Sequence, residues 1–121
     1  MAKDKIKLLI IDDEKDICEF EQSYFEKRGF EVLTARTGKS GVNLAKTKKP
    51  EVAIIDIHMA KEMDGIEALQ RILAFNPKCK CIMVTWDKER AGEAKKSGAV
   101  GFVIKPNNIE DLEKAVKRAA R

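Results

Sequence analysis

The chain of 121 residues has only three cysteines and one histidine, the residue types that form disulfides and zinc sites. Three cysteines cannot all pair, and Cys79 and Cys81 have no second Cys/His pair at the spacing of a tetrahedral zinc site. We therefore expect Cys18, Cys79 and Cys81 to be small, mostly buried thiols without a metal or redox role.

Long hydrophobic runs are also missing. Every apolar run is shorter than ten residues, whereas a membrane-spanning helix needs about 18. The first residues, MAKDKIK, lack the apolar centre of a signal peptide. We expect a cytoplasmic protein that does not contact a membrane.

Segments with charges of only one sign are scarce, because the 24 basic residues are interspersed with 20 acidic ones. The formal net charge is +4. Only KTKKP at 46–50 and the C-terminal KAVKRAAR carry one sign. Short runs of this kind are typical of solvated helix faces. The sequence therefore predicts no direct binding of nucleic acid.

The hydrophobic content of 44% is enough for one well-filled core in a chain of this length. Neither an internal repeat nor a low-complexity linker divides the sequence. We expect a single domain over residues 1–121.

Short apolar runs of strand length, rich in β-branched or aromatic residues, recur at residues 6–11, 32–35, 52–55, 81–85 and 102–104. The segments between them have helical periodicity, with apolar residues on one stripe and charges on the other. Strands that are apolar on both faces, such as KLLII and VAII, are typical of a covered parallel sheet. The pattern predicts a doubly wound, open α/β fold.

Residues typical of helix ends fall between these runs. Gly29, Gly98, Pro50 and Asn76-Pro77 suit helix C-termini. Helix starts are expected at Asp64-Gly65 and Asn107-Asn108, and a helix is expected over 38–48. Glu14 and Asp16 are expected at the start of the first helix, where negative charge suits the helix dipole.

Polar side chains follow four of the five expected strands: Asp12 and Asp13, Asp56, Thr85, and Lys105. In an open parallel sheet, these carboxyl ends meet at one edge. Carboxylates about 4 Å apart repel by roughly 4 kcal/mol at a surface-like dielectric. A hard cation such as Mg2+ fits such a cluster.

The remaining residues at this edge suit phosphate chemistry. Lys105 offers a positive charge and Thr85 a hydroxyl donor, and together they could hold two oxygens of a phosphoryl group. Asp56 is then the candidate nucleophile that becomes an acyl phosphate.

With LLIIDDE, VAIIDIHM, MDG, IMVT and GFVIKP in chain order, the sequence resembles the receiver domain of two-component response regulators, especially the stand-alone, chemotaxis-regulator-like members. The resemblance covers the whole chain. It implies a flavodoxin-like fold with a five-stranded parallel sheet, order 2-1-3-4-5, flanked by five helices.

The resemblance also implies site roles. Asp56 would accept a phosphoryl group from a histidine kinase or phosphotransfer protein. Mg2+ would bind to Asp13, Asp56 and the backbone carbonyl of His58, and to Asp12 through water. Thr85 and Lys105 would hold the phosphoryl oxygens.

In the family, the hydroxyl at the Thr85 position moves toward the phosphoryl group, and the aromatic residue at the Phe102 position swings inward. The alternative for Phe102 is a side chain simply buried in the last strand. The surface that changes would be the fourth helix, fifth strand and fifth helix, roughly 88–121. Because no DNA-binding domain follows the last residue, we expect output through an unidentified downstream protein, from a monomer or weak homodimer.

Several positions depart from the family pattern. Ala60 replaces the usual proline and one extra residue precedes Gly65, which predicts a longer, less rigid loop after His58. Trp86 replaces a small residue; it either lies on the fourth helix or a partner surface, or narrows access to Asp56 and slows attack by water and small donors.

Two more residues are candidates for tuning. Side chains at the positions of His58 and Asp87 flank the phosphoryl group in the family, so we predict a contact between them that affects dephosphorylation. The sequence Lys105-Pro106 resembles a cis peptide of the family that aims the lysine into the site.

Three alternative functions share features with this sequence. A phosphohydrolase of the haloacid-dehalogenase type needs a carboxylate two residues after the nucleophile, where this chain has His58. A flavodoxin-like cofactor carrier needs Gly, Ser and Thr in the loop after the first strand, which here is acidic. A degenerate receiver would act as a protein-interaction module without phosphorylation, but the set of site residues is complete.

Overall fold

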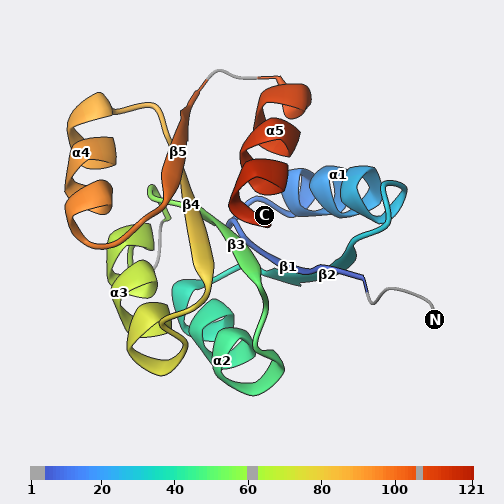
Figure 1. Ribbon diagram of the computed structural model, residues 1–121. Helices are drawn as coiled ribbons and strands as arrows, with labels where there is room; N and C mark the ends of the chain where they lie inside the picture. Colours follow the sequence, from blue (N-terminus) through green and yellow to red (C-terminus); the bar gives the residue numbers. More distant parts are fainter. Residues whose placement is uncertain (1–4, 60–62, 106–107) are drawn as a thin grey trace.

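The computed structural model describes residues 5–59, 63–105 and 108–121. Five parallel strands form one sheet in the order β2-β1-β3-β4-β5, and helices alternate with the strands along the chain (Figure 1). The elements are β1 (Lys7–Ile11), α1 (Lys15–Glu26), β2 (Glu31–Ala35), α2 (Gly38–Lys48), β3 (Val52–Asp56), α3 (Gly65–Phe75), β4 (Lys80–Thr85), α4 (Lys88–Lys96), β5 (Gly101–Ile104) and α5 (Ile109–Ala119). The predicted fold class and strand order are confirmed.

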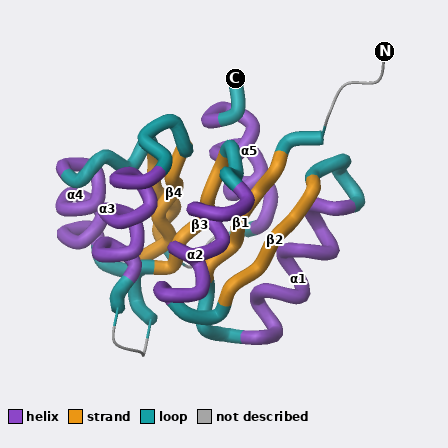
Figure 2. The backbone as a smooth tube through the Cα atoms, turned by 90° about the horizontal axis from the view of Figure 1, so that it is seen from below, coloured by secondary structure: helices purple, strands orange, loops and turns teal. Residues whose placement is uncertain are grey.

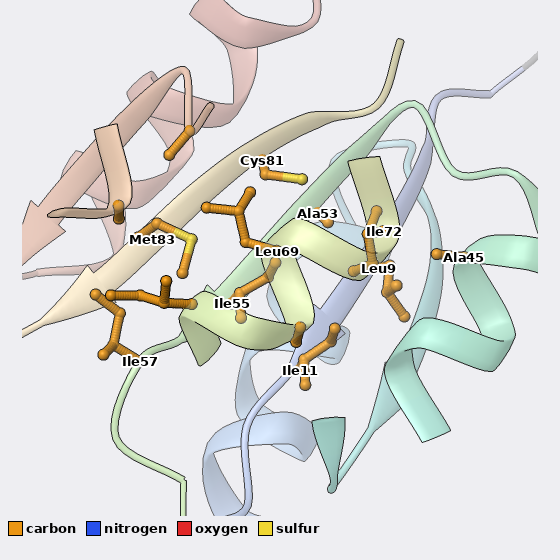
Figure 3. Close-up of a cluster of buried hydrophobic side chains, with 14 of the residues drawn as sticks. Leu9, Ile11, Ala45, Ala53, Ile55, Ile57, Leu69, Ile72, Cys81 and Met83 are labelled. Carbon is orange, nitrogen blue, oxygen red and sulfur yellow. The ribbon is translucent and has the colours of Figure 1, made fainter. Parts of the chain in front are cut away.

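The sheet is covered on both faces, by α1 and α5 on one side and by α2, α3 and α4 on the other (Figures 1 and 2). Alternate residues of each central strand point to opposite faces. In β1, Leu9 and Ile11 join the core under α2 and α3, whereas Leu8 and Ile10 join the core under α1 and α5. Figure 3 shows the first of these cores. The continuous apolar strands of the sequence therefore reflect burial on both sides.

The register of the central strands sets the position of the polar residues that follow them. β1 lies between β2 and β3, and Ile11 pairs with Ile55. One step further along both strands, Asp12 and Asp56 therefore lie side by side at the carboxyl edge of the sheet. The strand order reverses at this point, because β2 lies on one side of β1 and β3 lies on the other.

The helix ends use the residues that the sequence indicated. Asp64 caps α3 by accepting a hydrogen bond from the Glu67 N–H at 2.9 Å, and Asn108 caps α5 in the same way through the Asp111 N–H at 2.9 Å. Gly29 and Gly98, which follow α1 and α4, have φ of 91° and 111°, a conformation that favours glycine.

Ala60 in the loop after β3, the peptide bond to Pro106, and Asn107 as a capping residue all lie outside the described residues. Within the described ranges, none of the helices has the length and apolar content needed to cross a membrane.

Candidate functional site

Three carboxylates converge at the carboxyl edge of the sheet. One oxygen from each of Asp12, Asp13 and Asp56 lies within 4.8 Å of the others. Asp12 and Asp56 are only 5% and 4% exposed. Oxygen ligands at this spacing suit a hard divalent cation such as Mg2+.

The electrostatics of the cluster oppose full ionisation. The pKa of Asp12 is raised from 3.8 to about 6, mainly by burial and in smaller part by the charge of Asp56. The backbone N–H of Glu14, which donates to the Asp12 carboxylate at 2.9 Å, acts in the opposite direction. A cation bound here would relieve the repulsion and keep the carboxylates ionised.

Lys105 follows β5 and brings a positive charge to Asp56. Its Nζ lies 3.3 Å from Asp56 Oδ2. The Lys105 backbone N–H donates to the carbonyl of Thr85 at 2.7 Å, which ties the segment after β5 to the end of β4. The lysine is therefore held at the acceptor by a backbone contact as well as by charge.

The other Asp56 oxygen is held from the loop after β3. Oδ1 accepts a hydrogen bond from the His58 backbone N–H at 3.0 Å. The loop is in turn fixed to the start of α3, because the Gly65 N–H donates to the carbonyl of Ile57 at 3.0 Å. Both oxygens of Asp56 thus have defined partners.

Thr85, at the end of β4, is fully buried. Its hydroxyl accepts a hydrogen bond from the Asp87 backbone N–H at 3.0 Å and lies 2.7 Å from His58 Nε2. The His58 ring also stacks on the indole of Trp86, with centroids 4.5 Å apart and planes 17° from parallel. Trp86 is 63% exposed.

A cavity of about 540 Å3 opens beside this edge, between the sheet and the helices α1 and α5. Asp12, Asp56, Lys105 and Trp86 line it together with Glu21 of α1. Trp86 therefore lines the same cavity as Asp56, and its effect on access to the acceptor stays a prediction.

Glu21 is a site residue that the sequence reasoning missed. Burial raises its pKa from 4.5 to about 7, and the nearby charge of Asp12 acts in the same direction. The signal was present, because Glu21 lies four residues after Ile17 and four before Phe25, on the apolar stripe of α1. An acid on such a stripe indicates a side chain that faces into the protein.

The Asp87 carboxylate caps α4, accepting from the Glu89 N–H at 2.9 Å, and makes no hydrogen bond to His58 within the described part of the chain. The contact of Asp87 with His58 that would affect dephosphorylation stays a prediction. Phe102 is 40% exposed, with Lys95 Nζ 5.8 Å from its ring centroid, so the alternative that it is simply buried is wrong. β5 is an edge strand of the sheet and, among the described residues, pairs only with β4.

The model of the family described as "Response regulator receiver domain" matches residues 8–117. The chemotaxis protein CheY of Listeria monocytogenes is 34% identical over 119 residues, 96% of this chain and 99% of that protein. The regulatory protein AtoC of Escherichia coli K12 is 35% identical over 115 residues, 93% of this chain but 25% of AtoC.

A solved CheY-like receiver domain from Methanospirillum hungatei superposes with a TM-score of 0.90 at 29% identity, covering 96% of this chain and 94% of the other. The chain spans about a quarter of the length of the regulatory protein AtoC (25%) and of the transcriptional regulatory protein ZraR of Escherichia coli O157:H7 (27%). The family match covers nearly all of the sheet and helices described above. The chain belongs to the response regulator receiver domain family.

Proposed function

We propose that this receiver accepts a phosphoryl group on Asp56, from a histidine kinase or phosphotransfer protein, in a reaction that depends on Mg2+. The observation that carries the proposal is the environment of Asp56. Its buried carboxylate lies within 4.8 Å of oxygens of Asp12 and Asp13 and 3.3 Å from the Lys105 ammonium. This combination of nucleophile, metal ligands and phosphate-binding cation suits an acceptor of phosphoryl groups.

In the proposed reaction, an Asp56 oxygen attacks phosphorus while the P–N bond of the donor phosphohistidine breaks. The imidazole leaves with the electron pair of that bond and is neutralised by a proton. Lys105 and the Thr85 hydroxyl would bind the phosphoryl oxygens and stabilise their charge. With a small donor such as acetyl phosphate, acetate leaves in place of the imidazole.

The donor set fits Mg2+, because it consists of carboxylate oxygens gathered at one partly buried edge. Asp13, Asp56 and the backbone carbonyl of His58 would hold the ion, and Asp12 would contact it through water. When bound, the ion would neutralise charge on the carboxylates and the phosphoryl oxygens. Proteins of this family are signalling domains, and we propose that this one assists only its own phosphorylation and dephosphorylation.

The proposed output is a change in the face formed by α4, β5 and α5. Phe102 is exposed on β5, so an inward swing toward space vacated by Thr85 would bury apolar surface and alter that face. A downstream protein in the cytoplasm would read the change. His58, Trp86 and Asp87 are proposed to tune the lifetime of the phosphorylated state.

Mass spectrometry after incubation with Mg2+ and acetyl phosphate tests the function. We expect a labile phosphoryl adduct on the wild-type chain that disappears in Asp56→Ala and when a chelator removes Mg2+. Asp16→Ala is the matched control, because Asp16 is an exposed carboxylate in the first turn of α1, and it should retain the adduct. A wild-type chain without an adduct, or an adduct that survives in Asp56→Ala, would contradict the proposal.

A further inference from the structure

His58 and Trp86 form a ring pair that covers the buried end of β4. The indole is largely exposed, and the imidazole lies beneath it in a near-parallel stack. The same imidazole reaches inward, with Nε2 2.7 Å from the Thr85 hydroxyl oxygen. An exposed aromatic side chain is thus connected through one ring to a fully buried hydroxyl.

The hydrogen bonds of Thr85 identify His58 as the close partner of its hydroxyl. The oxygen accepts from the Asp87 N–H at 3.0 Å, and the Asp87 carbonyl lies 3.4 Å away, at the long limit for a hydrogen bond. A hydroxyl has one proton to donate. When Nε2 is unprotonated, that proton is directed to the imidazole; when Nε2 carries hydrogen, the imidazole donates to the hydroxyl.

The hydroxyl is therefore engaged away from the acceptor. Within the described residues, the Thr85 side chain makes no hydrogen bond to the Asp56 carboxylate or to Lys105. Whichever of the two groups donates, the contact with His58 keeps the hydroxyl in this position. A phosphoryl oxygen on Asp56 would bind the hydroxyl in another position, so the phosphoryl group and the His58 ring compete for it.

We propose that the stacked His58–Trp86 pair is a latch that holds Thr85 in its unphosphorylated position, and that phosphorylation of Asp56 releases Thr85 from His58 and loosens the pair. This inference rests on the proposed phosphoacceptor function. Phosphorylation shifts the equilibrium only by its preference for one arrangement. The latch stabilises the other arrangement and so opposes activation.

The position of His58 makes the coupling direct. Its backbone N–H donates to Asp56 Oδ1, while its side chain holds Thr85. One residue thus contacts both the acceptor and the side chain that the phosphoryl group recruits. Trp86, which follows Thr85 in sequence, packs on that residue from outside.

Trp86 is the single tryptophan of the chain, so intrinsic fluorescence reports on the pair. The experiment incubates the full chain with Mg2+ and acetyl phosphate, measures the adduct by mass spectrometry, and records Trp emission and acrylamide quenching in the same samples. We expect emission to shift and quenching to increase in proportion to the adduct. Asp56→Asn, treated in the same way, should show neither an adduct nor a shift.

His58→Phe separates the latch from direct sensing of phosphate charge. A phenyl ring can keep the stack on Trp86 but cannot bond to Thr85. We expect this variant to form the adduct while its emission no longer responds. Because one neutral hydrogen bond contributes about 0.5–1.5 kcal/mol, release of Thr85 should also speed phosphorylation by about 2- to 13-fold. Thr85→Val, which removes the hydroxyl, should likewise uncouple emission from the adduct.

The outcomes distinguish the two proposals. An adduct on the wild-type chain without any change in Trp86 emission would overturn the latch and leave the phosphoacceptor function standing. The same holds if His58→Phe and Thr85→Val respond like the wild type, since the indole would then sense the phosphoryl charge directly. Failure of the wild type to form an adduct would overturn both.

Discussion

Gly65, the first residue of α3, lies against the backbone of the acceptor, and replacing it with alanine tests how tightly that backbone is held. A Cβ at this position would lie 2.3 Å from the carbonyl oxygen of Asp56 and 2.6 Å from Cα of Ile57. Both atoms belong to the backbone, so no side-chain rotation can relieve the overlap. Because the Gly65 N–H is also hydrogen-bonded to the Ile57 carbonyl, the loop has to shift as a unit.

Such overpacking costs about 1–3 kcal/mol. Gly92→Ala is the matched control, because Gly92 lies within α4 and a Cβ there would meet no atom within 4 Å. That variant should gain up to about 1 kcal/mol from helix propensity. We therefore expect the free energy of unfolding of Gly65→Ala to lie about 1–4 kcal/mol below that of Gly92→Ala, a difference in Tm of roughly 3–20 °C for a domain of this size.

Urea denaturation followed by circular dichroism measures the difference in stability, and the initial rate of adduct formation with acetyl phosphate measures its effect at the site. Displacement of the Asp56 backbone should slow phosphorylation by about tenfold or more, whereas Gly92→Ala should leave the rate unchanged. Equal stability of the two variants, with an unchanged rate in Gly65→Ala, would refute the packing argument.

Three further changes have defined outcomes. Trp86→Ala should speed phosphorylation by acetyl phosphate, because a smaller side chain would widen access to Asp56. An unchanged rate would contradict the hypothesis that Trp86 narrows this access. Burial raises the pKa of Glu21 to about 7, so the folded chain binds its proton more tightly than the unfolded chain, and stability should fall as pH rises from about 4.5 to 7. Without Mg2+, Glu21→Gln should exceed the wild type by on the order of 2 kcal/mol at pH 8 and match it near pH 4 in urea titrations; parallel pH profiles would contradict this. The Tyr24 hydroxyl donates a hydrogen bond to Glu113 at 2.6 Å, and this bond is the main reason that the pKa of Glu113 is lowered to about 2. The stabilisation from this contact is lost as pH falls from 4.5 toward 2. In Tyr24→Phe, the NMR titration of Glu113 should move toward 4.5, and an unmoved titration would assign the shift to other partners.

Most of the fold could be predicted because each element's sequence agrees with its burial. In β1, consecutive residues such as Leu8 and Leu9 are both buried, one under each helical layer, so an unbroken apolar run marks a central parallel strand. The starts of α3 and α5 could also be predicted, because Asp64 and Asn108 have short polar side chains that accept hydrogen bonds from backbone N–H groups of the first turn. The observed strand bounds differ from the predicted ones by about one residue.

The side-chain contacts of the site could not be predicted in the same way. The partner of the His58 ring depends on its rotamer and on a loop that meets β4 across 27 positions of sequence. The Asp87 carboxylate accepts from an N–H group at the N-terminus of α4, a capping role that the sequence analysis did not assign to it. The resemblance already implied that the fifth strand lies at an edge, but the exposure of Phe102 depends on how the neighbouring helices cover that strand, which an apolar run does not encode.

The charge at the carboxyl edge explains why metal and phosphate would have to bind together in the proposed reaction. Asp12, Asp13 and Asp56 converge there, Glu21 faces the same cavity, and Lys105 contributes one positive charge. The raised pKa values of Asp12 and Glu21 reflect this burial of acids, so a phosphoryl dianion would enter a site that already disfavours negative charge. A divalent cation would supply the missing positive charge for both acids and phosphate. On this reasoning, affinity for Mg2+ should rise when Asp56 is phosphorylated, because each ligand lowers the electrostatic cost of the other.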